Sequence, residues 1–281
     1  MSDEAWIRLL LFSGILAVMA MWELFAPKRE LIQGYRRWPG NLGIVVVDSV
    51  VVRLIFPAGA IGAAIWTAEH GWGLLNLIEL PGWLVLFIAV VLLDLAIYLQ
   101  HVLVHAVPIL WRLHMVHHAD LDIDVTTGLR FHPAEIVFSM LIKIGVVVLL
   151  GAPALAVLIF ELILNGMAMF NHSNIHLPKT VDAIIRSLLV TPDMHRVHHS
   201  VIRRESNSNF GFNLSIWDRL FGTYTAQPKM GHKNMLIGLE QFQDEPTYRL
   251  KWMLRLPFTG FIGQYPIMKF GRGPKNGDAD V

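Results

Sequence analysis

The sequence predicts an all-α membrane protein in which four to five helical spans carry a histidine-rich helical cap on the cytoplasmic face. Three observations predict this fold class. The 281 residues are 54% hydrophobic and 16% charged, whereas soluble domains are usually about 45–50% apolar and about 25% charged. Several apolar stretches approach the roughly 20 residues of helix that cross a hydrocarbon core. The chain also has thirteen histidines and no cysteine.

The composition excludes several classes of protein. So apolar a chain is neither an ordinary cytosolic fold nor disordered, and a formal net charge of +1 offers no basic surface to nucleic acid. The lack of cysteine excludes disulfides, thiolate nucleophiles, iron–sulfur clusters and cysteine-ligated zinc. No internal repeat or clear boundary divides the sequence, so we expect residues 1–281 to form a single membrane-embedded domain.

The expected spans occupy much of the first 171 residues. They are residues 7–25, 43–66, 83–106, 133–150 and 153–171. The acidic pair Asp3 and Glu4 before the first span argues against a cleavable signal peptide. The last two spans meet at a tight turn around Gly151, and eighteen residues of helix extend only about 27 Å. These two segments therefore either just cross the bilayer or form a shallow hairpin.

Basic residues predict the orientation, because they favour cytoplasmic loops. The loop after the first span carries Lys28, Arg29, Arg36 and Arg37, and the loop 67–82 carries no Lys or Arg. This places residues 107–132 and all residues after 171 on the cytoplasmic side. Two amphipathic segments, residues 179–189 and 249–255, are expected to lie on that membrane face. We expect a bacterial inner membrane, with the endoplasmic reticulum as the alternative, because the sequence shows no C-terminal retrieval signal.

Ten histidines fall into four clusters. They are His101 and His105; His114, His117 and His118; His172 and His176; and His195, His198 and His199. Spacings of i, i+4 and i, i+3, i+4 place imidazoles on one face of a helix, where two of them can reach one ion. Neutral imidazole suits iron, zinc, copper or nickel. At this histidine frequency a single His-x-x-His-His motif is expected only about 0.03 times by chance.

The predicted topology brings the four clusters to one membrane–water boundary. One ion takes four to six ligands, so ten histidines indicate at least two metals. Four polar residues repeat at helical spacing before the ligands: Asp94, Tyr98, Asn165 and Glu161. Ligating histidines usually donate their second N–H to such groups, and buried acids in membrane helices are usually functional or paired. The alternative is that Asp94 pairs with Arg53, and Glu161 with Lys143, only for helix packing.

At these residues the sequence resembles the fatty acid hydroxylase/sterol desaturase superfamily of integral-membrane di-iron oxygenases, over about residues 83–224. The shared stretches are Asp94-x-x-x-Tyr98-x-x-His101-x-x-x-His105, Trp111-Arg-x-His114-x-x-His117-His118, Arg130-Phe-His132-Pro-x-Glu135, Asn171-His172-x-x-x-His176, His195-x-x-His198-His199 and Asn209-Phe-Gly-x-x-x-x-x-Trp217-Asp218-x-x-Phe221-Gly-Thr223. The resemblance implies that the ten clustered histidines bind two iron ions, with dioxygen as co-substrate and no separate catalytic residue. It also implies supporting positions for His132, which either lies behind the ligands or begins a helix, and for Asp218.

The resemblance implies a monooxygenase-type reaction in which an unactivated C–H bond of a lipid from the bilayer is hydroxylated. Sterol-type desaturation is the second possibility. The sequence has no haem-binding His-Pro-Gly-Gly module, so electrons are expected from a separate ferredoxin, cytochrome b5 or reductase. A membrane zinc hydrolase would need a His-Glu-x-x-His motif, which is missing. A metal transporter or storage protein would place histidines along a path through the bilayer instead of at one face.

Overall fold

Helices make up the regular structure of this chain. A computed structural model describes residues 3–260 and 262–268. Within these residues every regular element is an α or 3-10 helix, and β pairing is limited to three isolated bridges. Five helical stretches are long and apolar enough to cross a membrane. The predicted all-α, multi-pass membrane fold is therefore confirmed.

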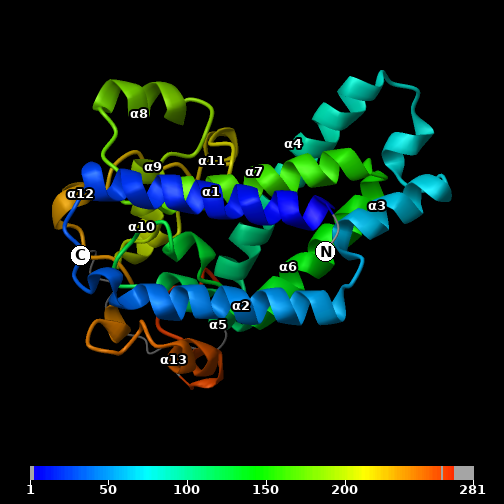
Figure 1. Ribbon diagram of the computed structural model, residues 1–281. Helices are drawn as coiled ribbons and strands as arrows, with labels where there is room; N and C mark the ends of the chain where they lie inside the picture. Colours follow the sequence, from blue (N-terminus) through cyan, green and yellow to red (C-terminus); the bar gives the residue numbers. More distant parts are fainter. Residues whose placement is uncertain (1–2, 261, 269–281) are drawn as a thin grey trace.

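The long helices form the membrane-embedded part. They are α1 (Asp3–Phe25), α2 (Trp38–Ile55), α3 (Gly59–Glu69), α4 (Gly82–Ala106), α6 (Pro133–Leu150) and α7 (Ala154–His172). Figure 1 shows α1 and α2 running along the bundle, with α6 and α7 packed against them. The apolar core between α3, α4, α6 and α7 includes Ala64, Leu93, Val157 and Phe160.

The second predicted span is not one helix. The expected helix over residues 43–66 is interrupted, because α2 ends at Ile55 and α3 begins at Gly59. Pro57 lies in the break, and Phe56 before it has φ −124° and ψ 68°, outside the helical region that a following proline disfavours. Gly59 has a φ of +58°, which glycine adopts without a Cβ clash. Hydropathy does not detect the break, because both pieces are apolar.

The predicted turn between α6 and α7 is confirmed. Gly151 ends α6 in the left-handed conformation with a φ of +66°, the usual use of glycine at a helix C-terminus. A Cβ at this position would lie 2.5 Å from the Trp72 carbonyl oxygen and 2.5 Å from Asn76 Nδ2. The turn is therefore packed against the loop that follows α3.

Short helices form a cap at the end of the bundle where α4 and α7 finish. They are α5 (Pro108–His118), α8 (Lys179–Arg186), α9 (Pro192–His198), α10 (Arg203–Ser206), α11 (Ile216–Leu220), α12 (Gly231–Asn234) and α13 (Leu250–Arg255). The 3-10 turns, which occur both in the cap and between the spans, are η1 (Gly34–Arg37), η2 (Leu74–Leu77), η3 (Thr127–Leu129), η4 (Glu240–Phe242) and η5 (Leu256–Phe258). In Figure 1, α9, α10 and α12 gather at the left, and α8 stands apart above them.

The two predicted amphipathic segments behave differently. Helix α8 buries Asp182 and Arg186, which form an ion pair, and exposes Val181 and Ile184. Its apolar face is thus turned away from the protein. The expectation that residues 249–255 also present an apolar face to the membrane is wrong. In α13 Met253 is buried in a core with residues of α2 and α5, because the protein itself offers this helix an apolar surface.

Candidate metal centre

Nine of the ten predicted histidines converge in the cap. One group consists of His101, His105, His114, His118 and His198, and the other of His117, His172, His195 and His199. Within each group, one nitrogen from every residue lies within 4.8 Å of the others. All nine side chains are buried. The predicted convergence of the four clusters at one end of the spans is therefore observed.

Both His-x-x-His-His motifs contribute to both groups. In α5, His114 and His118 belong to the first group and His117 to the second. In the second motif, in and directly after α9, His198 belongs to the first group, and His195 and His199 belong to the second. The rings of His118 and His199 stack across the boundary with their centroids 4.7 Å apart. The two groups consequently form one continuous two-part site.

Backbone carbonyls determine the tautomers of several histidines. Nδ1 of four rings lies within hydrogen-bond distance of a carbonyl oxygen: His101 to Phe210 (2.8 Å), His117 to Arg130 (3.2 Å), His172 to Ala168 (2.7 Å) and His198 to Ser208 (2.7 Å). A carbonyl oxygen can only accept, so Nδ1 carries the proton in each ring. The opposite nitrogen, Nε2, then presents a lone pair, which is the arrangement of a metal-binding histidine.

The lone pairs point at one another. Nε2 of His117 lies 3.1 Å from Nε2 of His172, and both rings donate from Nδ1 to carbonyls. No proton is available to join these two acceptors, so a cation bound by both nitrogens would remove the repulsion. Nε2 of His198 and Nε2 of His199 are buried without any hydrogen-bond partner. The residues present therefore fit metal ions bound through Nε2.

Burial keeps the cap histidines in the neutral form that metal ligation needs. Desolvation lowers the pKa of His117, His118 and His199 well below the usual range, and neighbouring imidazoles lower it further. The same causes act in the same order on the pKa of His195 and His198. At neutral pH the site thus offers uncharged nitrogen ligands, which suit iron, zinc, copper or nickel.

His176 does not join the other nine. It was expected to share a helix face with His172, but α7 ends at His172, and the chain beyond it is extended. The side chain of His176 is exposed and belongs to neither group. The i, i+4 argument fails here because it holds only inside a helix.

The acid that directly supports a histidine is Glu135, to which the sequence reasoning gave no role. Its Oε1 lies 2.6 Å from His114 Nδ1, in the first turn of α6. The signal was the Arg130-Phe-His132-Pro-x-Glu135 stretch, where the acid follows a proline that begins a helix. His132 itself caps this helix, because its Nδ1 accepts from the Ala134 N–H at 3.1 Å. The resemblance implied that His132 lies either behind the ligands or at the start of a helix, and the structure shows it at the start of α6.

Three other predicted residues, Asp218, Tyr98 and Asp94, stabilise the loop that contains Phe210 and Gly211. Asp218 accepts from the N–H groups of Phe210 and Gly211, each at 2.8 Å, and thus fixes the carbonyl that receives His101 Nδ1. Tyr98 reaches the same carboxylate through the Thr223 hydroxyl, which lies 2.9 Å from the Tyr98 hydroxyl and 2.7 Å from Asp218. Burial raises the pKa of Asp218 to about 6, against the effect of these donors, which lower it.

Asp94 holds the far end of that loop. Its Oδ2 accepts from Trp217 Nε1 at 2.7 Å and from the Leu214 N–H at 3.3 Å, so these partners replace the suggested pairing with Arg53. Glu161 does form the ion pair expected for helix packing, with Lys143 at 3.0 Å, and a second one with Arg8 at 2.9 Å.

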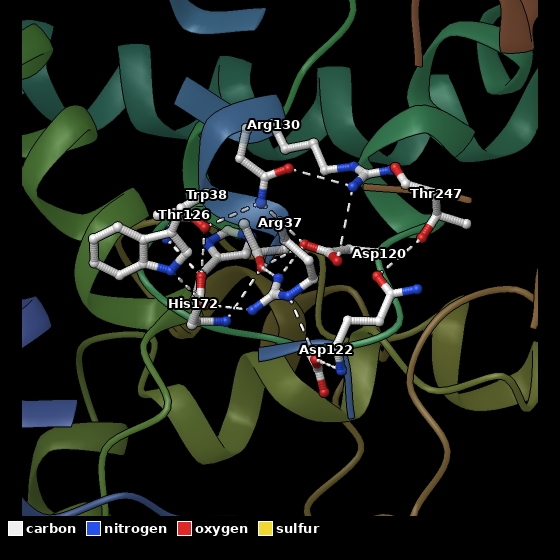
Figure 2. Close-up of polar contacts among 12 residues, drawn as sticks. Arg37, Trp38, Asp120, Asp122, Thr126, Arg130, His172 and Thr247 are labelled. Carbon is white, nitrogen blue, oxygen red and sulfur yellow. Dashed lines mark hydrogen bonds and ion pairs between the residues drawn. The ribbon is translucent and has the colours of Figure 1, made fainter. Parts of the chain in front are cut away.

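A buried charge network stands behind the second histidine group (Figure 2). Arg37 Nη1 lies 2.5 Å from Asp120 Oδ2, and Arg37 also pairs with Asp124. Arg130 lies 3.7 Å from Asp120 and donates to the Thr247 carbonyl at 2.7 Å. Burial raises the pKa of Asp120, but the charges of Arg37 and Arg130 outweigh it and lower that pKa. Because Arg130 also carries the acceptor for His117, the network positions this histidine.

A cavity of about 560 Å³ lies among the membrane helices next to the histidine groups. Phe131 and Phe212 line it beside the site. The Phe131 ring stacks on His117 at a centroid distance of 4.4 Å, and Phe212 lies 6.3 Å from His172. Asn165, predicted to support a ligand, lines this cavity instead. Phe131 and Phe212 therefore separate this cavity from the histidine rings.

Comparisons with known proteins identify a family and several relatives. The family model for fatty acid hydroxylase matches residues 86–223. The chain is 32% identical over 142 residues to the ornithine lipid hydroxylase OlsE of Rhizobium tropici, covering 50% of this chain and 42% of that protein. It is 32% identical over 243 residues to the alkylglycerol monooxygenase of Xenopus tropicalis, covering 83% of this chain and 52% of that protein. No solved structure matches.

The matched segment contains all nine converging histidines, Glu135 and the loop that Asp218 fixes. The chain spans about half the length of the two relatives described. The family model and both relatives agree with the resemblance carried by the sequence motifs. The chain therefore belongs to the fatty acid hydroxylase/sterol desaturase superfamily.

Proposed function

We propose that this protein hydroxylates a bilayer lipid at an unactivated C–H bond, with dioxygen as co-substrate and two iron ions as cofactor. The observation that carries the proposal is the pair of buried histidine groups beside a cavity among the membrane helices. Both relatives described above are named as oxygen-inserting enzymes of lipids. Bound ferrous ions would supply the electrons and open coordination positions that activate dioxygen.

The protein's own residues would hold and shield this chemistry. The nine histidines would be the ligands, with five nitrogens in one group and four in the other. The carbonyls of Phe210 and Arg130 and the Glu135 carboxylate orient the rings. Phe131 and Phe212 cover the cavity side of the rings, where they exclude water and press an alkyl segment toward the site.

The remaining requirements concern electrons and location. We propose a separate ferredoxin, cytochrome b5 or reductase as donor, because the chain has no cysteine for an iron–sulfur centre. We also propose one domain in a bacterial inner membrane with the site on the cytoplasmic side, supported by the basic loop that contains Arg36. A cysteine introduced at exposed Lys179 should then react with an impermeant maleimide only in inside-out vesicles. Labelling in right-side-out vesicles would contradict this orientation.

Metal and product analysis tests the function. Protein purified gently under reducing conditions should contain about two irons per chain, whereas one zinc without iron would contradict the proposal. Cells with and without the gene should differ by lipids heavier by one oxygen. Lipids lighter by two hydrogens would instead indicate desaturation, the second function expected of this superfamily. No change in either direction in iron-loaded, reduced enzyme would refute both.

A further inference from the structure

The cavity beside the histidines is mostly apolar but also has charged side chains in its lining, which a simple hydrocarbon pocket would lack. It lies among α1, α2, α4, α6 and α7, and five of its lining residues are charged: Arg8, Asp48, Glu135, Lys143 and Glu161. Charges inside a membrane bundle are costly and are retained where they pair or bind something. Glu161 is satisfied by its ion pairs with Lys143 and Arg8. Asp48 is different.

Asp48 has a buried carboxyl group without a partner among the described residues. Its side chain is 8% exposed, and its Oδ1 is enclosed without a hydrogen bond. Among the described residues, no ion pair includes Asp48. Two further acceptors on the same cavity wall are also enclosed without partners: Glu135 Oε2 and Gln100 Oε1. Leaving such groups unsatisfied in a low-dielectric interior costs free energy, and the cost is greatest for a carboxylate.

The unpartnered buried atoms of this cavity are all acceptors. A matching ligand therefore brings several N–H donors, and a positive charge to neutralise Asp48. A hydroxyl offers one donor and no charge, whereas an ammonium offers three donors and a full charge. Charge-assisted hydrogen bonds of this kind are about twice as strong as neutral ones.

We propose that the cavity binds the primary amine of a lipid substrate, with Asp48 as the counter-ion and Gln100 as a second acceptor. The assignment of this lipid as substrate rests on the proposed function, but binding of the amine does not. Asp48 and Gln100 lie on α2 and α4, and Phe131, which lines the same cavity, stacks on His117. The amine would thus fix how far along the substrate the reactive position lies.

Direct binding tests the proposal. The probe is tritiated dodecanoyl amide of 1,4-diaminobutane, which has an acyl chain and one free amine, compared with the same molecule acetylated at that amine. Binding is measured by scintillation proximity on purified full-length protein in a non-ionic detergent. Wild-type protein should bind the free amine at least about tenfold more tightly than the acetylated form, or about 1.4 kcal/mol. Equal binding of the two probes would overturn the proposal.

Variants assign the effect to Asp48. Asp48→Asn should reduce the preference for the amine to less than about twofold, and Asp48→Glu should keep part of it. Asp244→Asn, the same change at an exposed residue, should leave the preference intact. Asp48→Asn should be at least as heat-stable as wild type without probe, because it removes a buried carboxyl group that has no partner. Full preference in Asp48→Asn, or its loss in Asp244→Asn, would contradict the assignment.

Iron content and product formation are measured on the same preparations. A clear amine preference in protein that binds no iron would refute the proposed function and leave this inference standing. Iron-loaded protein that hydroxylates lipids without an amine, and that does not distinguish the two probes, would refute this inference alone.

Discussion

The individual histidines are prepared for metal by what lies behind them. His101, His117 and His198 each donate from Nδ1 to a backbone carbonyl, so their tautomer is fixed before any ion arrives. His114 uses a carboxylate, Glu135, for the same purpose. Such partners orient the ring and raise its basicity as a ligand. The sequence identified nine of the converging histidines, but most of the groups that orient them are carbonyls, which every residue has.

At this scale, His198 and His176 make a matched pair of substitutions. His198→Ala should lower the iron content from about two to about one per chain and reduce product formation by more than about hundredfold, because it removes a ligand from the five-histidine group. His176→Ala should retain both irons and full activity, because its side chain is exposed and outside both groups. Elemental analysis and product mass spectrometry measure the two effects. Equal metal loss in the two variants would refute this ligand assignment.

At the scale of elements, the spans and their ends agree closely with the apolar stretches of the sequence. The exception is the break between α2 and α3, where a proline and a glycine end one helix and start another. A second exception is α13, which packs on the protein instead of facing outward. Local patterns define an amphipathic helix well, but the surface that covers its apolar face is a tertiary property.

The α6–α7 turn provides a test of the element scale. Gly151→Ala should destabilise the protein by about 2 kcal/mol or more, because alanine is strained at positive φ and its Cβ would lie 2.5 Å from the Trp72 carbonyl oxygen. Gly145→Ala is the control in the same helix pair, since nothing lies within 4 Å of its Cβ position. It should be neutral or stabilising by up to about 1 kcal/mol. Thermal unfolding in detergent compares them, and equal melting temperatures would contradict the packing argument.

At the scale of the whole molecule, the charge network joins distant parts of the chain. Arg37 lies directly before α2, Asp120 follows the second histidine cluster, and Thr247 belongs to the C-terminal segment. In the sequence, Arg36 and Arg37 were equivalent evidence for a cytoplasmic loop. In the structure, Arg37 is fully buried among aspartates, whereas Arg36 is exposed.

These neighbouring arginines give a prediction about the whole fold. Arg37→Gln should destabilise the protein by about 3–5 kcal/mol, because it leaves buried carboxylates without their counter-ion. It should also weaken metal retention, since Asp120 and Arg130 lie behind His117. Arg36→Gln removes the same charge from the same loop and should change stability by less than about 0.5 kcal/mol. Chemical or thermal unfolding measures the stability of both variants. A similar loss of stability in the two would refute the role given to Arg37.

The sequence by itself determined the membrane class, the five apolar stretches, the family and nine histidines that converge in the cap. It did so because hydropathy and the i, i+3, i+4 spacing are local properties of a helix. The tertiary structure decided what depends on partners far along the chain. It excluded His176 where α7 ends, set Glu135 behind His114, buried Arg37 against Asp120 and left Asp48 without a partner. Hydrogen bonds and buried charges are satisfied between elements, so no single stretch of sequence contains them.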